Sequence, residues 1–93
     1  MSEAINALDE LRGQIDEIDL KLLALLNARA EIVLRIQDLK LELGLPPYSA
    51  IREGEIIDQL RAANKGPLPD QAVEDIFREI LQHSLSSLVL TDD

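Results

Sequence analysis

The sequence contains no cysteine, which excludes disulfide bonds and thiolate chemistry. Its only aromatic residues are Tyr48 and Phe77, so it offers no platform for stacking nucleic-acid bases. No apolar run approaches the ~20 residues of a membrane span, and the acidic start Met-Ser-Glu-Ala is unlike a signal peptide. A net charge of −9 at pH 7 disfavours binding to nucleic acid and to anionic membranes. We therefore predict a soluble, cytoplasmic protein that binds neither.

The sequence also has little that suggests metal or nucleophilic chemistry. His83 is the only histidine, and we expect it on the surface of a helix. The sequence has no cluster of histidine and cysteine typical of zinc sites, and no glycine-rich loop typical of nucleotide sites. We therefore predict no metal site.

Leucine and isoleucine, in contrast, are abundant and follow helical spacing. From about Ala4 to Leu43 the intervals between apolar residues alternate between three and four, with one gap. This pattern predicts a long helix with one apolar seam of the coiled-coil kind. Gly44, followed by Pro46 and Pro47, should end this helix. The seam consists of Leu8, Leu11, Ile15, Ile18, Leu22, Leu25, Ile32, Ile36, Leu39 and Leu43.

The length of this helix bears on assembly. About 40 residues at 1.5 Å each give a rod of ~60 Å, whereas a compact monomer of this size has a radius of gyration of only ~12 Å. The remaining residues are too few to cover the seam, so we predict an intertwined homodimer.

Two shorter helices complete an all-α fold, in which residues 1–93 form a single domain. Ser49 can cap a helix from Ala50 to about Ala63, and Pro69-Asp70 opens a third helix. The expected apolar face of the second helix consists of Ile51, Ile56, Ile57 and Leu60. The third helix should carry Val73, Ile76, Phe77, Ile80, Leu81, Ser84 and Leu88 at helical spacing.

Arg29 occupies the gap in the seam, where its guanidinium needs a glutamate, an anionic ligand or a path to solvent. Lys40 lies eleven residues further on, about three turns or ~16 Å, on the same face. Arg12 is ~42 Å from Lys40, so it can join them only from an antiparallel partner chain. Arg52 and Glu53 begin the second helix and can close over such a site. This geometry predicts a site for a small polyanion, suited to a reaction that needs only orientation and charge stabilisation.

An ordered set of residues runs through nearly the whole chain. Its first part is LRxxIDxIDxxLLxLLxxR over residues 11–29, followed by Lys40, by Gly44-Leu45-Pro46 to Tyr48, and by Arg52-Glu53. It ends with Asn64-x-Gly66-Pro67, with Ile76-Phe77-x-Glu79-Ile80 and with Ser84. This set resembles the all-helical chorismate mutases, in the versions fused to prephenate dehydratase or to the first shikimate-pathway synthase.

The resemblance implies a homodimer with two sites that converts chorismate, a small dianion of aromatic amino acid biosynthesis, to prephenate. This Claisen rearrangement needs no metal, cofactor or covalent intermediate. By the resemblance, Arg12 of one chain and Arg29 of the other bind the two carboxylates. Lys40 donates to the ether oxygen, and Glu53 accepts from the substrate hydroxyl. Arg52 and Ser84 support carboxylate binding, and a fused or associated shikimate-pathway enzyme is an implied partner.

Two positions depart from the family pattern. Ser49 stands where the family often has aspartate, and it either meets the substrate or only caps the helix. Leu88 stands where the family usually has glutamine or glutamate, a second donor to the ether oxygen. We therefore expect weakened activity, unless Leu88 only packs against the long helix.

Two other interpretations stay open at this point. One is a sister enzyme of the same fold, an isochorismate pyruvate lyase or an aminodeoxychorismate mutase. Glu53 suits a hydroxylated or an aminated ring equally. The other is a non-catalytic helical dimer that regulates an aromatic-pathway synthase.

Overall fold

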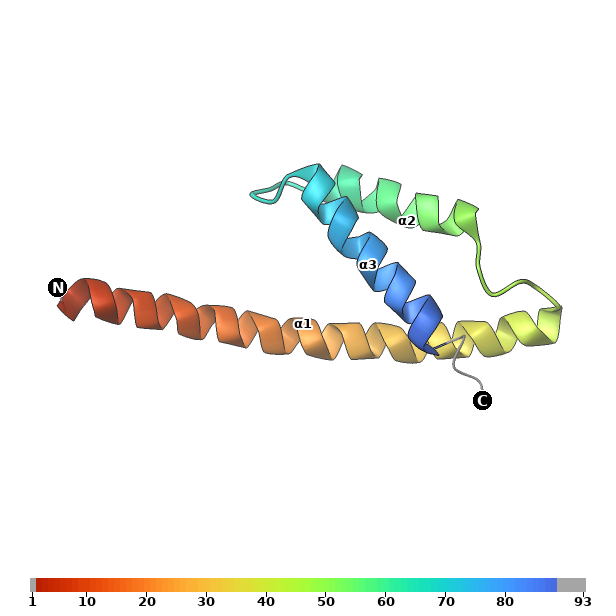
Figure 1. Ribbon diagram of the computed structural model, residues 1–93, viewed down its shortest axis with the longest axis horizontal. Helices are drawn as coiled ribbons and strands as arrows, with labels where there is room; N and C mark the ends of the chain where they lie inside the picture. The colour runs from red at the N-terminus through yellow and green to blue at the C-terminus, as the bar shows by residue number, and fades with distance from the viewer. Residues whose placement is uncertain (1, 89–93) are drawn as a thin grey trace. The chain divides into compact units, whose positions relative to one another are not determined.

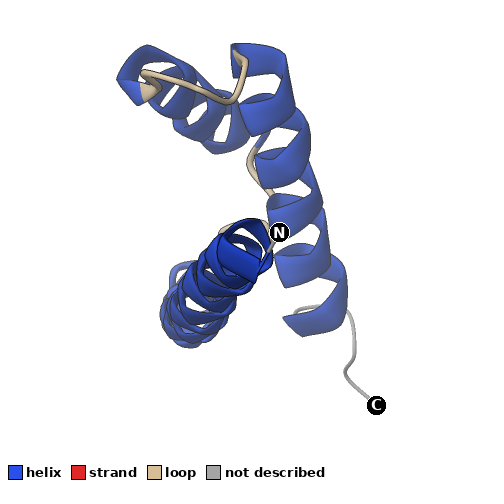
Figure 2. Cartoon of the chain, turned by 90° about the vertical axis from the view of Figure 1, so that its left-hand side faces the viewer, coloured by secondary structure: helices blue, strands red, loops and turns tan. Residues whose placement is uncertain are grey.

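The computed structural model describes residues 2–88, with side chains described over residues 2–85. It contains three helices, α1 over Ser2–Leu43, α2 over Ala50–Ala63 and α3 over Asp70–Leu88 (Figure 1). Two loops join these helices, and residues 2–88 include no strand (Figure 2). The predicted all-α fold of one long and two shorter helices is therefore confirmed. No helix in this part of the chain is long and apolar enough to span a membrane. The described residues fall into two units, divided between Ile32 and Val33.

The end of α1 follows from Gly44. Its φ of 67° is a left-handed conformation that favours glycine. The N–H of Gly44 donates to the carbonyl of Leu41 at 3.2 Å, and the N–H of Leu45 donates to that of Lys40 at 2.8 Å. These two bonds form a Schellman motif, which satisfies carbonyls that a helix end otherwise leaves unpaired. The predicted helix stop is therefore confirmed at atomic level.

The seam of α1 is uncovered within the single chain. All ten of its residues are between 43 and 70% exposed, and α1 contains no buried residue. Such an apolar stripe along a helix in water is typical of a surface that another chain covers. The homodimer stays a prediction, and this exposure is the observation that supports it.

Helices α2 and α3 pack against one another and provide the buried core of the described chain. Ile57 of α2 and Val73 of α3 are buried, and Leu60 and Phe77 are half-buried. The expectation that Ile51 shares the apolar face of α2 is wrong, because this residue is 79% exposed. Ile51 lies six positions before Ile57, which places it about 120° around the helix from the packed face.

The loop between α2 and α3 is organised by Asn64. Its Nδ2 donates to the carbonyl of Leu68 and to Oδ1 of Asp70, both at 2.8 Å. Its Oδ1 accepts from the N–H of Gly66 at 3.0 Å. Gly66 has a φ of 77°, and its peptide bond to Pro67 is cis. One side chain thus connects the end of α2 to the first residue of α3.

Candidate functional site

Lys40, in the last turn of α1, is held by the loop that follows it. Its Nζ donates to the carbonyl oxygen of Pro47 at 3.0 Å, and Nε2 of Gln37 donates to the same oxygen at 3.3 Å. An ammonium group has three hydrogens, so Lys40 can still donate to a ligand while it keeps the bond to Pro47. A donor that is fixed before the ligand arrives is the arrangement that stabilises developing charge most effectively.

The start of α2 is built on Ser49. Its Oγ accepts from the N–H of Arg52 at 3.2 Å, and its carbonyl accepts from the N–H of Glu53 at 3.1 Å. These bonds make Ser49 the N-cap, as predicted, and they fix the backbone of the two residues expected to face a ligand. The hydroxyl hydrogen of Ser49 can still donate to a ligand.

The guanidinium of Arg52 is weakly engaged. It lies 3.6 Å from the carboxylate of Glu55, one turn further along the helix, and both side chains are mostly exposed. An exposed pair of this kind contributes little to stability, so Arg52 can turn to another anion at small cost.

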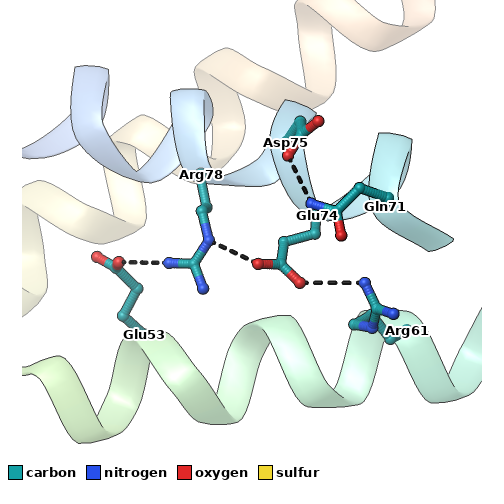
Figure 3. A network of polar contacts seen from close by, with 6 residues as sticks. All are labelled: Glu53, Arg61, Gln71, Glu74, Asp75 and Arg78. Carbon is teal, nitrogen blue, oxygen red and sulfur yellow. Dashed lines mark hydrogen bonds and ion pairs between the residues drawn. The ribbon is translucent and has the colours of Figure 1, made fainter.

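Glu53 is the first member of a network of four charged residues that alternate in sign between α2 and α3 (Figure 3). Its Oε1 accepts from Nη1 of Arg78 at 3.2 Å. Nε of Arg78 donates to Oε2 of Glu74 at 2.9 Å, and Nη1 of Arg61 donates to Oε1 of Glu74 at 3.1 Å. We call Glu53, Arg78, Glu74 and Arg61 the charge network.

The neighbours of Arg78 favour its charged form. The hydrogen bond to Glu74 raises the pKa of Arg78, desolvation opposes this effect, and the charges of Glu74 and Glu53 raise the pKa further. An arginine is a cation at every physiological pH in any case, so Arg78 is a permanent cation between two carboxylates.

Sequence reasoning missed the charge network. The motif Ile76-Phe77-x-Glu79-Ile80 leaves position 78 unspecified. The spacing of Glu74 and Arg78 could have predicted their helical pair, because residues four apart are neighbours on a helix. No sequence signal pairs Arg78 with Glu53, which lies 25 residues away and on another helix.

The two other predicted arginines belong to the unit that precedes Val33. Arg12 is exposed on α1, and Arg29 is half-buried. Lys40, Arg52 and Glu53 belong to the unit that follows Ile32. A site shared by all five residues therefore stays a prediction.

The remaining candidates lie on α3. The hydroxyl of Ser84 is half-buried and donates to the carbonyl of Ile80 at 2.8 Å, while its oxygen can accept from a ligand. His83 is exposed, 3.6 Å from Glu79, which confirms the predicted surface position. The side chain of Leu88 lies outside the described residues. Within residues 2–85, no three potential ligands lie together as a metal site requires.

Comparison with known proteins places this arrangement in a family. Residues 11–87 match the family model described as chorismate mutase type II. A bifunctional chorismate mutase/prephenate dehydratase of Aquifex aeolicus is 41% identical over 83 residues, covering 85% of this chain and 23% of the relative. The chain thus spans about a quarter of the length of such bifunctional relatives.

Two further matches are to shorter proteins and cover most of each of them. A chorismate mutase of Methanocaldococcus jannaschii is 33% identical over 81 residues, covering 86% of this chain and 82% of the relative. The structure of chorismate mutase (form II) from Thermus thermophilus superimposes with a TM-score of 0.87 at 37% identity. That match covers 92% of this chain and 98% of the other. The chain therefore belongs to the chorismate mutase type II family.

Proposed function

We propose that this protein is a chorismate mutase, which rearranges chorismate to prephenate in a site shared between the two chains of a homodimer. The observation that carries the proposal is that the residues expected to bind chorismate and to stabilise its rearrangement all lie within residues 11–87, which match the family model. This set consists of Arg12, Arg29, Lys40, Arg52 and Glu53. The relative from Methanocaldococcus jannaschii is named a chorismate mutase, and the match covers most of its length, which supports the proposal.

The proposed reaction places modest demands on the protein. In the rearrangement one C–O bond breaks and one C–C bond forms through a chair-like transition state, and no proton is transferred. Negative charge grows on the ether oxygen as the C–O bond breaks. The protein must hold the reactive conformer and stabilise this charge, and neither task requires a nucleophile.

In this proposal Lys40 stabilises the negative charge that grows on the ether oxygen. Its ammonium is held by Pro47 before the substrate arrives and retains hydrogens for the ether oxygen. Arg12 of one chain and Arg29 of the other bind the two carboxylates and so select the conformer that reacts. Arginine suits this task because its planar fork can donate two parallel hydrogen bonds to a carboxylate.

Residues at the start of α2 bind the ring hydroxyl of the substrate and help to bind a carboxylate. Glu53 accepts a hydrogen bond from the ring hydroxyl, while Arg52 and Ser84 support carboxylate binding. Ser49, already the cap of α2, donates its hydroxyl hydrogen where the family often has aspartate. Leu88 cannot donate a hydrogen bond, so the ether oxygen depends on Lys40.

The homodimer and the cellular setting are part of the same proposal. The exposed seam of α1 supports an intertwined pair of chains, and Arg12 acts in the partner's site. We place the protein in the cytoplasm, where it serves aromatic amino acid biosynthesis. A prephenate dehydratase domain, present in the longer relatives, is the proposed fused or associated partner.

One experiment tests the function. The purified protein is incubated separately with chorismate, with isochorismate and with an amino analogue of chorismate, and the products are separated and identified. The Lys40→Ala protein is the matched control. We expect prephenate from the unaltered protein and far less from the control. Release of pyruvate from isochorismate, with no prephenate from chorismate, would indicate the lyase of the same fold. Turnover of neither substrate, nor of an amino analogue of chorismate, would leave a regulatory dimer as the better interpretation.

A further inference from the structure

We propose that Arg78 is a positioning residue, which holds the carboxylate of Glu53 in the orientation that accepts the substrate hydroxyl. The inference rests on the proposed function, because it assigns Arg78 a role through Glu53. It starts from the charge network, in which Arg78 lies between two carboxylates, one on α2 and one on α3 (Figure 3).

The contacts of Arg78 fix its guanidinium from two sides. Nε is bound to Glu74 at 2.9 Å, one turn earlier on the same helix. Nη1 is bound to Glu53 at 3.2 Å. A guanidinium is planar and rigid, so a bond at Nε also restricts the direction in which Nη1 donates. Glu74 therefore orients Arg78, and Arg78 in turn orients Glu53.

The arrangement leaves one oxygen of Glu53 for a ligand. Oε1 is occupied by Arg78, whereas no described residue donates to Oε2. In Figure 3 this second oxygen points away from Arg78. A carboxylate can accept about four hydrogen bonds, so the bond to Arg78 restricts its rotation without using up its capacity. A substrate hydroxyl would meet an acceptor that is already in place.

Partial burial of Glu53 makes a cationic neighbour favourable. Its side chain is 26% exposed, against 49% for Arg78. A carboxylate that has lost part of its hydration is stabilised by an opposite charge and a hydrogen bond. Arg78 supplies both, and it keeps its charge at every physiological pH.

A purely structural role is the competing explanation, since Arg78 also links α3 to α2. The chain provides a matched control for it. Arg61 lies on α2 and binds Glu74 of α3 at 3.1 Å, so it links the same helices without touching Glu53. Arg61→Gln removes one link and leaves the bond between Glu74 and Arg78 in place. Arg78→Gln removes the other link and releases Glu53.

The test compares kcat and KM for chorismate, and thermal stability, in Arg78→Gln, Arg78→Lys and Arg61→Gln homodimers. We expect Arg78→Gln to lower kcat/KM by about 10- to 100-fold, because a misplacement of ~1 Å at a reacting centre can cost that much. Arg61→Gln should stay within about twofold of the unaltered protein. Arg78→Lys should recover part of the loss, because lysine keeps the charge but not the rigid fork.

A double-mutant cycle with Glu53 separates positioning from stability. If Arg78 acts through Glu53, Arg78→Gln should change kcat/KM by less than about twofold when Glu53→Gln is already present. Equal losses in both backgrounds would overturn the inference. Equal effects of Arg78→Gln and Arg61→Gln on kcat/KM would overturn it too.

A spectroscopic measurement keeps this inference separate from the proposed function. The carboxyl-carbon NMR resonance of Glu53, identified by its loss in Glu53→Gln, should shift in Arg78→Gln and stay in place in Arg61→Gln. An unchanged resonance in Arg78→Gln would show that Arg78 does not hold Glu53, whatever the activity. If the resonance responds but the unaltered protein forms no prephenate, the positioning contact stands and the proposed function fails.

Discussion

The seam of α1 allows the proposed dimer to be tested with a single side chain. Ile18 lies near the middle of the unit that precedes Val33, and 51% of its surface is exposed in the single chain. Full burial of an isoleucine stabilises by about 1.5–3 kcal/mol, so burial of the exposed half in a dimer contributes about 0.8–1.5 kcal/mol per chain. A two-fold dimer contains the position twice. We therefore expect Ile18→Ala to weaken the dimer by about 1–3 kcal/mol, which raises the dissociation constant about 5- to 150-fold.

Sedimentation equilibrium over a series of protein concentrations measures this constant directly. Circular dichroism melts at the same concentrations add a second test, since the Tm of an obligate dimer depends on concentration. Ile18→Glu should abolish the dimer, because the partner would bury an unpaired carboxylate. Glu17→Ala is the matched control. Glu17 is next to Ile18 in the sequence but lies outside the seam, so its substitution should leave the dissociation constant unchanged. A folded helical monomer of the unaltered protein, or an Ile18→Ala protein with the same constant, would refute the reasoning.

Four further predictions concern the site and the loop. Arg12→Ala and Arg29→Ala homodimers should each lose most activity. Heterodimers of the two variants should regain activity at one of their two sites, because one site then holds both substitutions and the other holds neither. No recovery in proven heterodimers would exclude a shared site. Lys40→Ala should lower kcat by about 10²- to 10³-fold with a smaller effect on KM, whereas an effect confined to KM would assign Lys40 to ground-state binding. Leu88→Gln should raise kcat/KM about tenfold by restoring a donor; a lower Tm at unchanged activity would show that Leu88 only packs. Asn64→Ala should lower the free energy of unfolding by about 1–3 kcal/mol in urea titrations, because three hydrogen bonds are lost. Unchanged stability would mean that water replaces them.

The helix boundaries could be predicted because they depend on local chemistry. Gly44 ends α1 through a left-handed conformation that few other residues adopt. Ser49 starts α2 by accepting a backbone N–H three residues ahead. Asn64 and Gly66 end α2 through contacts within four residues. All of these interactions lie within one turn or loop, so the sequence alone contains the necessary information.

The candidate site could be predicted only in part. Helical periodicity assigned Arg29 and Lys40 to one face of α1, because that step requires no knowledge of packing. The pairing of Glu53 with Arg78 depends on the rotation of α2 and α3 against each other, and no spacing in the sequence encodes it. The same rotation leaves Ile51 exposed although its side chain is apolar. Motif strings record which residues are present, whereas the contacts among them are decided by tertiary packing.

Helices α2 and α3, here called the α2–α3 hairpin, pack against each other within one chain, whereas the seam of α1 is exposed, and this difference bears on the order in which the protein folds. The α2–α3 hairpin buries Ile57 and Val73 within one chain, so its formation is a first-order process, and such local contacts form quickly. The seam of α1 finds no cover within its own chain, and in the proposed dimer it is buried only when two molecules meet. That step is second-order, and it slows as the protein is diluted. In the proposed dimer, the contacts between α2 and α3 are therefore available before two chains meet, whereas the shared site is completed only by dimerisation.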